Sequence, residues 1–286
     1  MRKKLSEVNK DQKQFWSGKG GDIWVERQEA MDTMLSPLGE VVIKELNLLS
    51  KDKVLDIGCG CGSTSIDIAE HLSLNGAVTG VDISKPMLDR AKLSAKNKSL
   101  NNIDFQLKDV QSENLPNEHF SVAFSRFGVM FFENPFEAFS NIYRSLKAGG
   151  RLGFVCWQSP KFNPWQSLSI QAIRKYIELP SYPKRNPGPF AFQERSYIEE
   201  IINKANFKYL KILALEKEVE MFKGKGLEHA TEDYLSINPV ITEMLKKSTE
   251  EVKESVKNAL ISSFEPYYSD NKLTFPSSTW IVTAVK

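Results

Sequence analysis

The chain has 286 residues, of which 41% are hydrophobic and 26% charged, an ordinary composition for a globular protein. Its net charge is +2, and lysines and acids are interleaved, so no basic stripe indicates nucleic-acid binding. No apolar run approaches the roughly 18 residues of a membrane span. The basic start is followed by a polar run, which is unlike a signal peptide. The length allows one large α/β domain with insertions, or a domain with a cap.

The N-terminal 50 residues are predicted to form a helical segment. Residues 1–27 alternate between polar and aromatic side chains, with Trp16 and Trp24 among the latter. Apolar residues then recur at helical spacing from Met31 to Leu49. Pro37 is expected to break or kink this helix, because proline removes a backbone donor.

A glycine-rich turn follows the first predicted strand, residues 53–57. Gly58, Gly60 and Gly62 are spaced two apart, and a helix is predicted to begin near Ser63. Glycine adopts positive φ without penalty and lets the bare backbone approach a ligand. The helix behind the turn offers free N–H groups. The spacing does not fit the dinucleotide fingerprint G-x-G-x-x-G, because serine occupies the position of the last glycine.

Acidic residues follow the next two predicted strands. Asp82 ends a buried strand about 20 residues beyond the glycines. A carboxylate there can accept one hydrogen bond from each of two ribose hydroxyls. Ser84 is the predicted N-cap of the next helix. Asp109 closes the strand predicted at 103–107.

The rest of the core continues to alternate strands with helices. A strand at 119–125 leads into an aromatic loop, and a helix then precedes a strand at 151–156. Near-continuous apolar strands separated by helices predict a parallel sheet covered on both faces.

The pattern changes after Trp157. Prolines and aromatic residues crowd the next stretch, which we expect to be a cap insertion within 157–210 that ends in a helix near 194–205. The part from 211 to 286 is predicted to hold the last two strands, at 211–221 and 279–285. Between them we expect a helical insertion at 222–275.

The cysteines and histidines do not suggest a metal centre. Cys59 and Cys61 are one residue apart, too close for an ordinary disulfide or a C-x-x-C zinc site. Together with Cys156 they are expected to be small buried residues in a reduced cytoplasm. The three histidines lack metal-ligand spacing, so no metal is expected, and no catalytic base is assigned.

These motifs, in this order over residues 54–155, resemble class I S-adenosylmethionine (SAM) methyltransferases. The resemblance is to a bacterial branch acting on small molecules, whose core is similar to quinone-pathway methyltransferases. It implies a Rossmann-like, mostly parallel sheet of seven strands with helices on both faces. The final strand would lie antiparallel between the fifth and sixth. The SAM-binding core would be 51–156, with residues 1–50 covering the cofactor site and a helical cap beyond.

The resemblance also implies roles for individual residues. Those that would contact SAM are Asp56, Gly58, Gly60, Gly62, Asp82, Ile83, Asp109, Val110 and Ser125. Asp56 would lie near the methionine amino group, and the Ser125 carbonyl would meet the methionine end. The three glycines would let methionine and ribose approach the backbone. Asp82 would hold the ribose hydroxyls, and Ile83 would touch the adenine face. The adenine amino group would donate to Asp109, while the Val110 N–H would donate to the ring.

Three further residues are candidates for the substrate side. Arg126 would bind the methionine carboxylate or an anionic acceptor, or else pair with a surface acid such as Glu133. Trp24 and Trp157 would line the acceptor pocket or fill the core of the cap.

The resemblance predicts an enzyme that transfers a methyl group from SAM to a small-molecule acceptor. Two alternatives are a quinone- or lipid-directed C- or O-methyltransferase and a SAM-binding protein that does not catalyse transfer. No nucleic acid and no membrane span are expected. The oligomeric state is open, with a homodimer as one candidate.

Overall fold

The structure is a computed structural model that describes residues 9–73, 75–180 and 183–286. Parts of two expectations lie outside the described residues: positions 1–8 of the N-terminal segment and 181–182 of the cap insertion.

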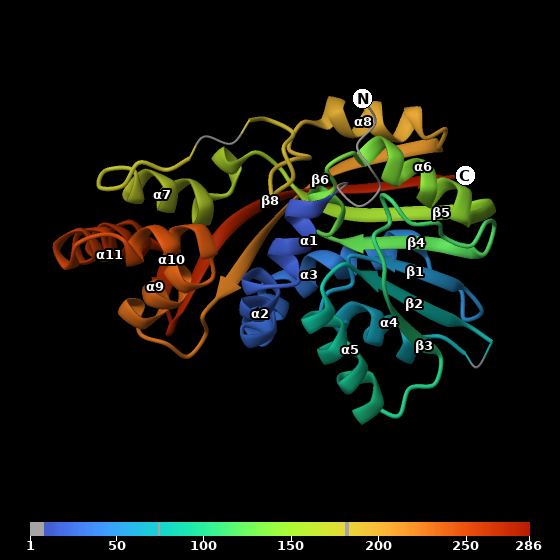
Figure 1. The fold of residues 1–286 in the computed structure, drawn as a ribbon, viewed down its shortest axis with the longest axis horizontal. Helices are drawn as coiled ribbons and strands as arrows, with labels where there is room; N and C mark the ends of the chain where they lie inside the picture. The colour runs from blue at the N-terminus through green and yellow to red at the C-terminus, as the bar shows by residue number, and fades with distance from the viewer. Residues whose placement is uncertain (1–8, 74, 181–182) are drawn as a thin grey trace.

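One twisted sheet organises the molecule (Figure 1), in the order β3-β2-β1-β4-β5-β8-β6. The first five strands are parallel, and β8 pairs antiparallel with both β5 and β6. This confirms the predicted mostly parallel sheet with its last strand antiparallel. A short β7 pairs only with β8. The strands are β1 (Lys53–Ile57), β2 (Ala77–Asp82), β3 (Ile103–Leu107), β4 (Phe120–Arg126), β5 (Leu146–Trp157), β6 (Lys208–Met221), β7 (Tyr268–Ser269) and β8 (Lys272–Val285).

Helices cover both faces of the sheet (Figure 1). Helix α3 packs against β4, β5, β6 and β8, and α4 packs against β2 and β3, while α6 and α8 lie against β5 and β6. The helices are α1 (Lys10–Trp16), α2 (Lys19–Glu26), α3 (Gln28–Leu46), α4 (Ser63–His71), α5 (Lys85–Asn97), α6 (Pro135–Ser145), α7 (Pro164–Ile173), α8 (Arg195–Lys204), α9 (Leu227–Ser236), α10 (Pro239–Lys246) and α11 (Glu250–Phe264).

The predicted N-cap at Ser84 and the predicted buried first strand are both present in the structure. The Ser84 side chain caps α5 by accepting from the Met87 amide. Val54, Leu55 and Ile57 of β1 are all buried, as expected for a central strand with both faces covered.

The largest differences from the predicted boundaries are in α3, β5 and β8. Helix α3 runs through Pro37 without ending, because it packs across the sheet with Leu35, Leu38 and Val42 buried. Strand β5 begins at Leu146 instead of 151, and its register against β4 shifts between Phe120 and Val122. Strand β8 begins at Lys272, well before 279, because its first half pairs with β6.

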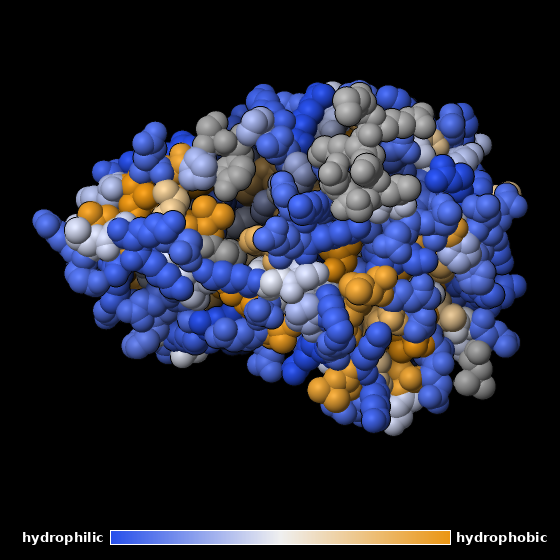
Figure 2. Space-filling model, in the orientation of Figure 1, coloured by the Kyte–Doolittle hydropathy of each residue, from blue (hydrophilic) through white to orange (hydrophobic). Residues whose placement is uncertain are grey.

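Helices α7, α9, α10 and α11, which we call the helical cap, stand beyond the sheet. They are carried by the long strands β6 and β8 (Figure 1), and α11 packs on both α7 and α9. Figure 2 shows a mostly hydrophilic face, with hydrophobic areas over α7 and near α5.

Asn163 connects the chain after β5 to β8. It is fully buried. Its Nδ2 donates to the carbonyl oxygens of Gln158, Ser159 and Ser278 at 3.3, 3.2 and 3.1 Å. Its Oδ1 accepts from the Ser278 amide at 3.1 Å. One side chain therefore fixes where the cap leaves the sheet.

We predict that Asn163→Ala lowers the free energy of unfolding by about 2–4 kcal/mol, because it leaves several buried backbone groups unpaired. Urea unfolding measures this, with Asn186→Ala, at an exposed position, as the control. Equal stability of the two variants would contradict the structural role given to Asn163.

Candidate cofactor site

The glycine turn after β1 depends on backbone conformations that suit glycine. Gly58, Gly60 and Gly62 have φ values of 66, 55 and 80°. The Gly58 amide donates to the Val81 carbonyl at 2.9 Å, which holds the turn against β2. A Cβ on Gly58 would lie 2.9 Å from the Cα of Gly128, so neither chain segment has room for a side chain there.

Asp82 connects this turn to the start of α5. Its side chain is buried, with 7% exposed. One carboxylate oxygen accepts from the Gly60 amide at 2.9 Å, and the other accepts from the Ser84 amide at 2.8 Å. Burial raises the pKa of Asp82, and these backbone hydrogen bonds oppose the rise. A carboxylate has about four acceptor positions, so each oxygen keeps capacity for another donor.

Gly60 has room for a Cβ, with ordinary contacts on that side. A Cβ built on it would have two described atoms within 4 Å, the Met87 sulfur at 3.8 Å and the Trp24 Nε1 at 3.9 Å. Trp24 of α2 therefore lies across from the glycine turn. Glycines of positive φ, the Asp82 carboxylate and Trp24 therefore lie together at this turn.

Asp56, near the end of β1, is the second buried carboxylate of the site. It is 2% exposed and accepts from the Ser65 hydroxyl at 2.5 Å. Burial raises the pKa of Asp56 to about 6, while the hydrogen bond from Ser65 and the positive charge of Arg126 oppose the rise. Ser125 is fully buried, and its hydroxyl donates to the Ile57 carbonyl at 2.7 Å. The ends of β1 and β4 are thus joined beside Asp56.

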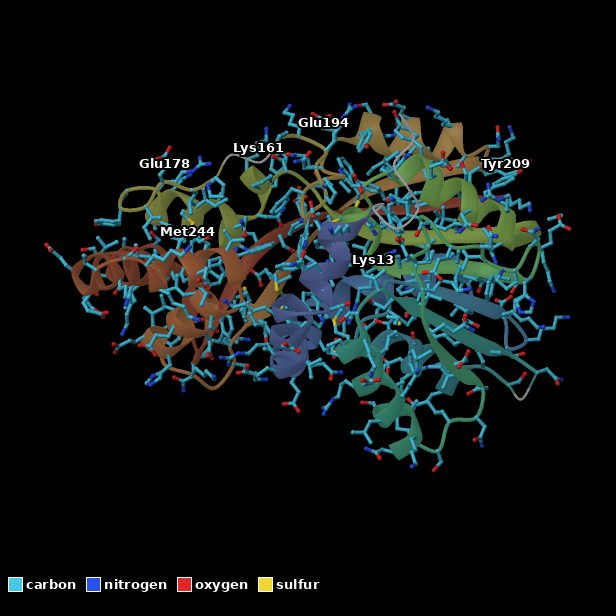
Figure 3. All side chains as sticks on the ribbon, viewed as in Figure 1. Lys13, Lys161, Glu178, Glu194, Tyr209 and Met244 are labelled. Atoms are coloured by element: carbon cyan, nitrogen blue, oxygen red, sulfur yellow. The ribbon has the colours of Figure 1, made fainter. Side chains whose placement is uncertain are left out.

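Helix α1 crosses the carboxyl ends of β2, β3 and β4. Ser17 donates to the Ile83 carbonyl at 2.9 Å, and the Ser84 hydroxyl donates to the Trp16 carbonyl at 2.6 Å. The Trp16 ring packs edge-on against Phe131 at 5.0 Å. Sequence reasoning missed these contacts because α1 is short and its partners are distant in the chain. In Figure 3, Lys13 of α1 lies between the sheet and the helical cap.

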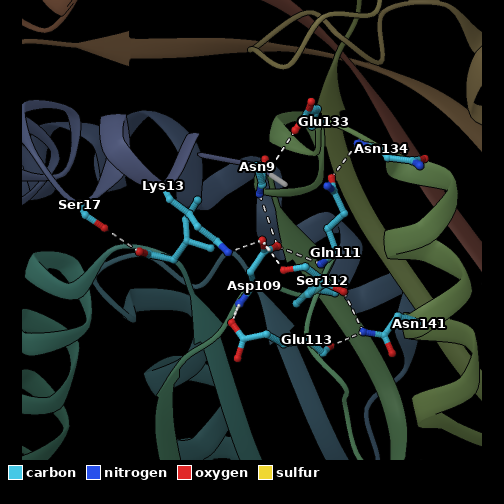
Figure 4. A network of polar contacts seen from close by, with 12 residues as sticks. Asn9, Lys13, Ser17, Asp109, Gln111, Ser112, Glu113, Glu133, Asn134 and Asn141 are labelled. Atoms are coloured by element: carbon cyan, nitrogen blue, oxygen red, sulfur yellow. Dashed lines mark hydrogen bonds and ion pairs between the residues drawn. The ribbon is translucent and has the colours of Figure 1, made fainter. Parts of the chain in front are cut away.

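Asp109 is the centre of a polar network (Figure 4). Its carboxylate is 1% exposed. It pairs with Lys13 at 2.9 Å and accepts from Asn9 Nδ2 at 3.4 Å. It also accepts from the Gln111 amide at 3.0 Å and the Ser112 hydroxyl at 2.8 Å. Lys13 and Asn9 were not among the predicted site residues.

The Val110 amide, next to Asp109, makes no hydrogen bond with any described residue. Its side chain is buried, and its carbonyl accepts from Asn141 Nδ2 at 2.8 Å. The amide is therefore a donor available to a ligand.

Arg126, at the end of β4, is bound by helix α3. Its guanidinium pairs with Asp32 at 2.6 Å and donates to the Ser36 hydroxyl at 2.9 Å. Its side-chain stem packs so closely on Gly39 that a Cβ there would lie 2.9 Å from its Cδ. Arg126 thus forms an ion pair, but with Asp32 and not with Glu133, the acid named as an example from the sequence. Glu133 accepts from the Asn9 amide at 2.7 Å.

Trp157 belongs to an aromatic cluster at the ends of β4 and β5. It stacks on Phe127 with ring centres 4.5 Å apart and lies 5.0 Å from Trp165. Trp165 contacts Phe190 at 6.0 Å. The buried Trp165 Nε1 has no hydrogen-bond partner among the described residues.

The described residues hold no group of three or more His, Cys, Asp or Glu side chains arranged for a metal ion. Across 9–73, 75–180 and 183–286, no helix combines the length and apolarity needed to cross a bilayer.

Comparison with known proteins matches residues 54–150 to a methyltransferase domain family. Aklanonic acid methyltransferase DauC from Streptomyces sp. (strain C5) is 29% identical over 127 residues, 44% of this chain and 56% of that protein. The chain therefore spans about half of that relative's length. Demethylmenaquinone methyltransferase from Listeria welshimeri is 25% identical over 187 residues, 65% of this chain and 75% of that protein.

Solved structures agree on the fold. Phosphoethanolamine N-methyltransferase 2 from Haemonchus contortus, solved in complex with SAM, superimposes with a TM-score of 0.58 at 18% identity. That likeness covers 96% of this chain and 59% of the other. The matched domain over 54–150 and these relatives support a class I SAM-dependent methyltransferase.

Proposed function

We propose that this protein transfers the methyl group of SAM to a small acceptor held between the glycine turn and the helical cap. The observation that carries the proposal is the Asp82 carboxylate, which is fixed by the Gly60 and Ser84 amides and retains capacity to accept from both ribose hydroxyls. SAM supplies an electrophilic methyl group on a sulfonium.

The buried residues around the turn hold the cofactor in this proposal. Asp56 lies at the methionine end with Ser125, and Ile83 and Val110 border the adenine, with Asp109 beside them. Gly58, Gly60 and Gly62 let the backbone approach. Holding donor and acceptor about 3 Å apart in line supplies much of the rate enhancement. The segment 9–50, which crosses the strand ends through α1, would exclude water.

The acceptor side is aromatic. Phe127 stacks on Trp157, and the Trp165 ring lies tilted against Trp157, with ring centres 5.0 Å apart. Arg126 is engaged by Asp32 and Ser36, which favours a structural role over binding an anionic acceptor. We therefore propose a flat, weakly charged acceptor. A quinone fits this description, and one relative is named for demethylmenaquinone.

The non-catalytic alternative has no support, because the relatives reported above are methyltransferases. We place the protein in the cytoplasm, because its three cysteines are free and buried. The net charge of +2 favours a small molecule over a nucleic acid. A homodimer is the first oligomeric state to test.

We predict that Asp82→Ala weakens SAM binding by roughly 1.5–3 kcal/mol, through the lost charge-assisted hydrogen bonds. Calorimetric titration measures the affinity. Release of S-adenosylhomocysteine with a panel of quinones and other flat acceptors measures transfer.

The matched control is Asp104→Ala, an exposed carboxylate on β3. If both variants bind SAM as the wild type does, the ribose assignment is wrong. If the wild type binds SAM but releases no product with any acceptor, the proposed transfer to a flat acceptor is wrong.

A second prediction follows from the Asp56 pKa of about 6. Only the ionised carboxylate attracts the methionine ammonium, so lowering the pH from 8 to 5 should weaken S-adenosylhomocysteine binding about tenfold. In Asp56→Asn this decrease should be much smaller, with a residual part from Asp82, whose pKa is raised too. Titrations across this pH range test it, and an equally steep dependence in both proteins would remove Asp56 from the methionine end.

A further inference from the structure

Helix α2 lies between α5 and the helical cap (Figure 1). On one side it packs against α5, and its Trp24 Nε1 lies 3.9 Å from the position of a Cβ on Gly60. It also packs against α1, and Ser17, which follows α1, donates to the Ile83 carbonyl at 2.9 Å. This side of α2 is therefore held beside the glycine turn.

On its other side, α2 reaches the cap through charged side chains at both of its ends. The guanidinium of Arg27, directly after α2, pairs with Asp233 of α9 at 2.9 Å and donates to the Ser236 hydroxyl at 3.3 Å. Lys19, the first residue of α2, pairs with Glu243 of α10 at 3.1 Å. The described residues show no extensive backbone packing between α2 and either cap helix, so these side chains make the connection.

The Arg27 contact is the stronger of the two. The Lys19 and Glu243 side chains are 46% and 51% exposed, and an ion pair at such a position contributes little. The Arg27 and Asp233 side chains are 27% and 14% exposed, and both terminal nitrogens of the guanidinium are engaged. Asp233 also pairs with Lys225, so removal of Arg27 does not leave this acid unpaired.

We propose that Arg27 is a positioning residue that couples cofactor binding to closure of the cap. A nucleoside bound at Gly60 contacts Trp24 and holds α2 in one position. Arg27, at the end of the same helix, then holds α9, so the acceptor side is organised once the cofactor is bound. The coupling is reciprocal, since a closed cap strengthens cofactor binding by the same factor. This inference rests on the proposed function, through the placement of the nucleoside beside Gly60.

Hydrogen–deuterium exchange measures this coupling without an identified acceptor. In the wild type, saturating S-adenosylhomocysteine should slow amide exchange in the glycine turn, in α2 and also in α9. In Arg27→Ala the slowing should persist in the turn, while the protection that the ligand confers on α9 should fall about fivefold. Arg27→Lys keeps the charge but loses the fork, so its α9 response should lie between the two.

Arg195→Ala is the matched control, because Arg195 forms an exposed ion pair with Glu199 on α8. It should respond to S-adenosylhomocysteine as the wild type does. The inference is wrong if Arg27→Ala keeps the full α9 response, or if the wild type protects its glycine turn but not α9. If the ligand protects neither region of the wild type, the proposed cofactor site itself is wrong.

Thermal unfolding shows whether Arg27→Ala folds. If it does not, the same exchange experiment on the wild type in about 0.5 M sodium chloride replaces it, because salt screens a partly exposed ion pair. The α9 response should then weaken while the response of the glycine turn remains. An α9 response that is independent of salt would contradict the inference.

Discussion

The buried carboxylate of Asp82 is the constraint on which the site depends. It holds the Gly60 amide on one side and the Ser84 amide on the other, so the glycine turn and the start of α5 cannot move independently. Burial opposes its ionisation, and the backbone donors offset that cost. Each oxygen keeps capacity for a further donor. In the proposed function, one group would therefore make both a structural contact and a binding contact.

The core could be predicted from sequence because its signals are local. The strand that ends at Ile57, the glycines after it and the Ser84 cap each follow from a few neighbouring residues, and each is present. The position of the last strand, antiparallel between the fifth and sixth, followed from the family resemblance. The start of β8 was predicted too late, at 279 instead of 272, because its first half pairs with β6, which lies far away in the sequence.

The contacts of the N-terminal segment could not be predicted in the same way. Lys13, Asn9 and Ser17 lie on or next to a seven-residue helix, and their partners are 66 to 124 residues away. Arg126 shows the same limit: an ion pair was one of two alternatives, but the partner is Asp32 on α3. Charge and sequence spacing identify which residues can pair. They do not say which distant element the fold brings beside them.

We propose that the ribose of SAM binds the remaining acceptor positions of Asp82. The most direct measurement is a crystal structure of the protein grown with S-adenosylhomocysteine. We predict that both ribose hydroxyls lie within hydrogen-bond distance of the Asp82 carboxylate, with the nucleoside against Gly60. A nucleoside bound away from this turn, with Asp82 contacting only its own backbone donors, would contradict it.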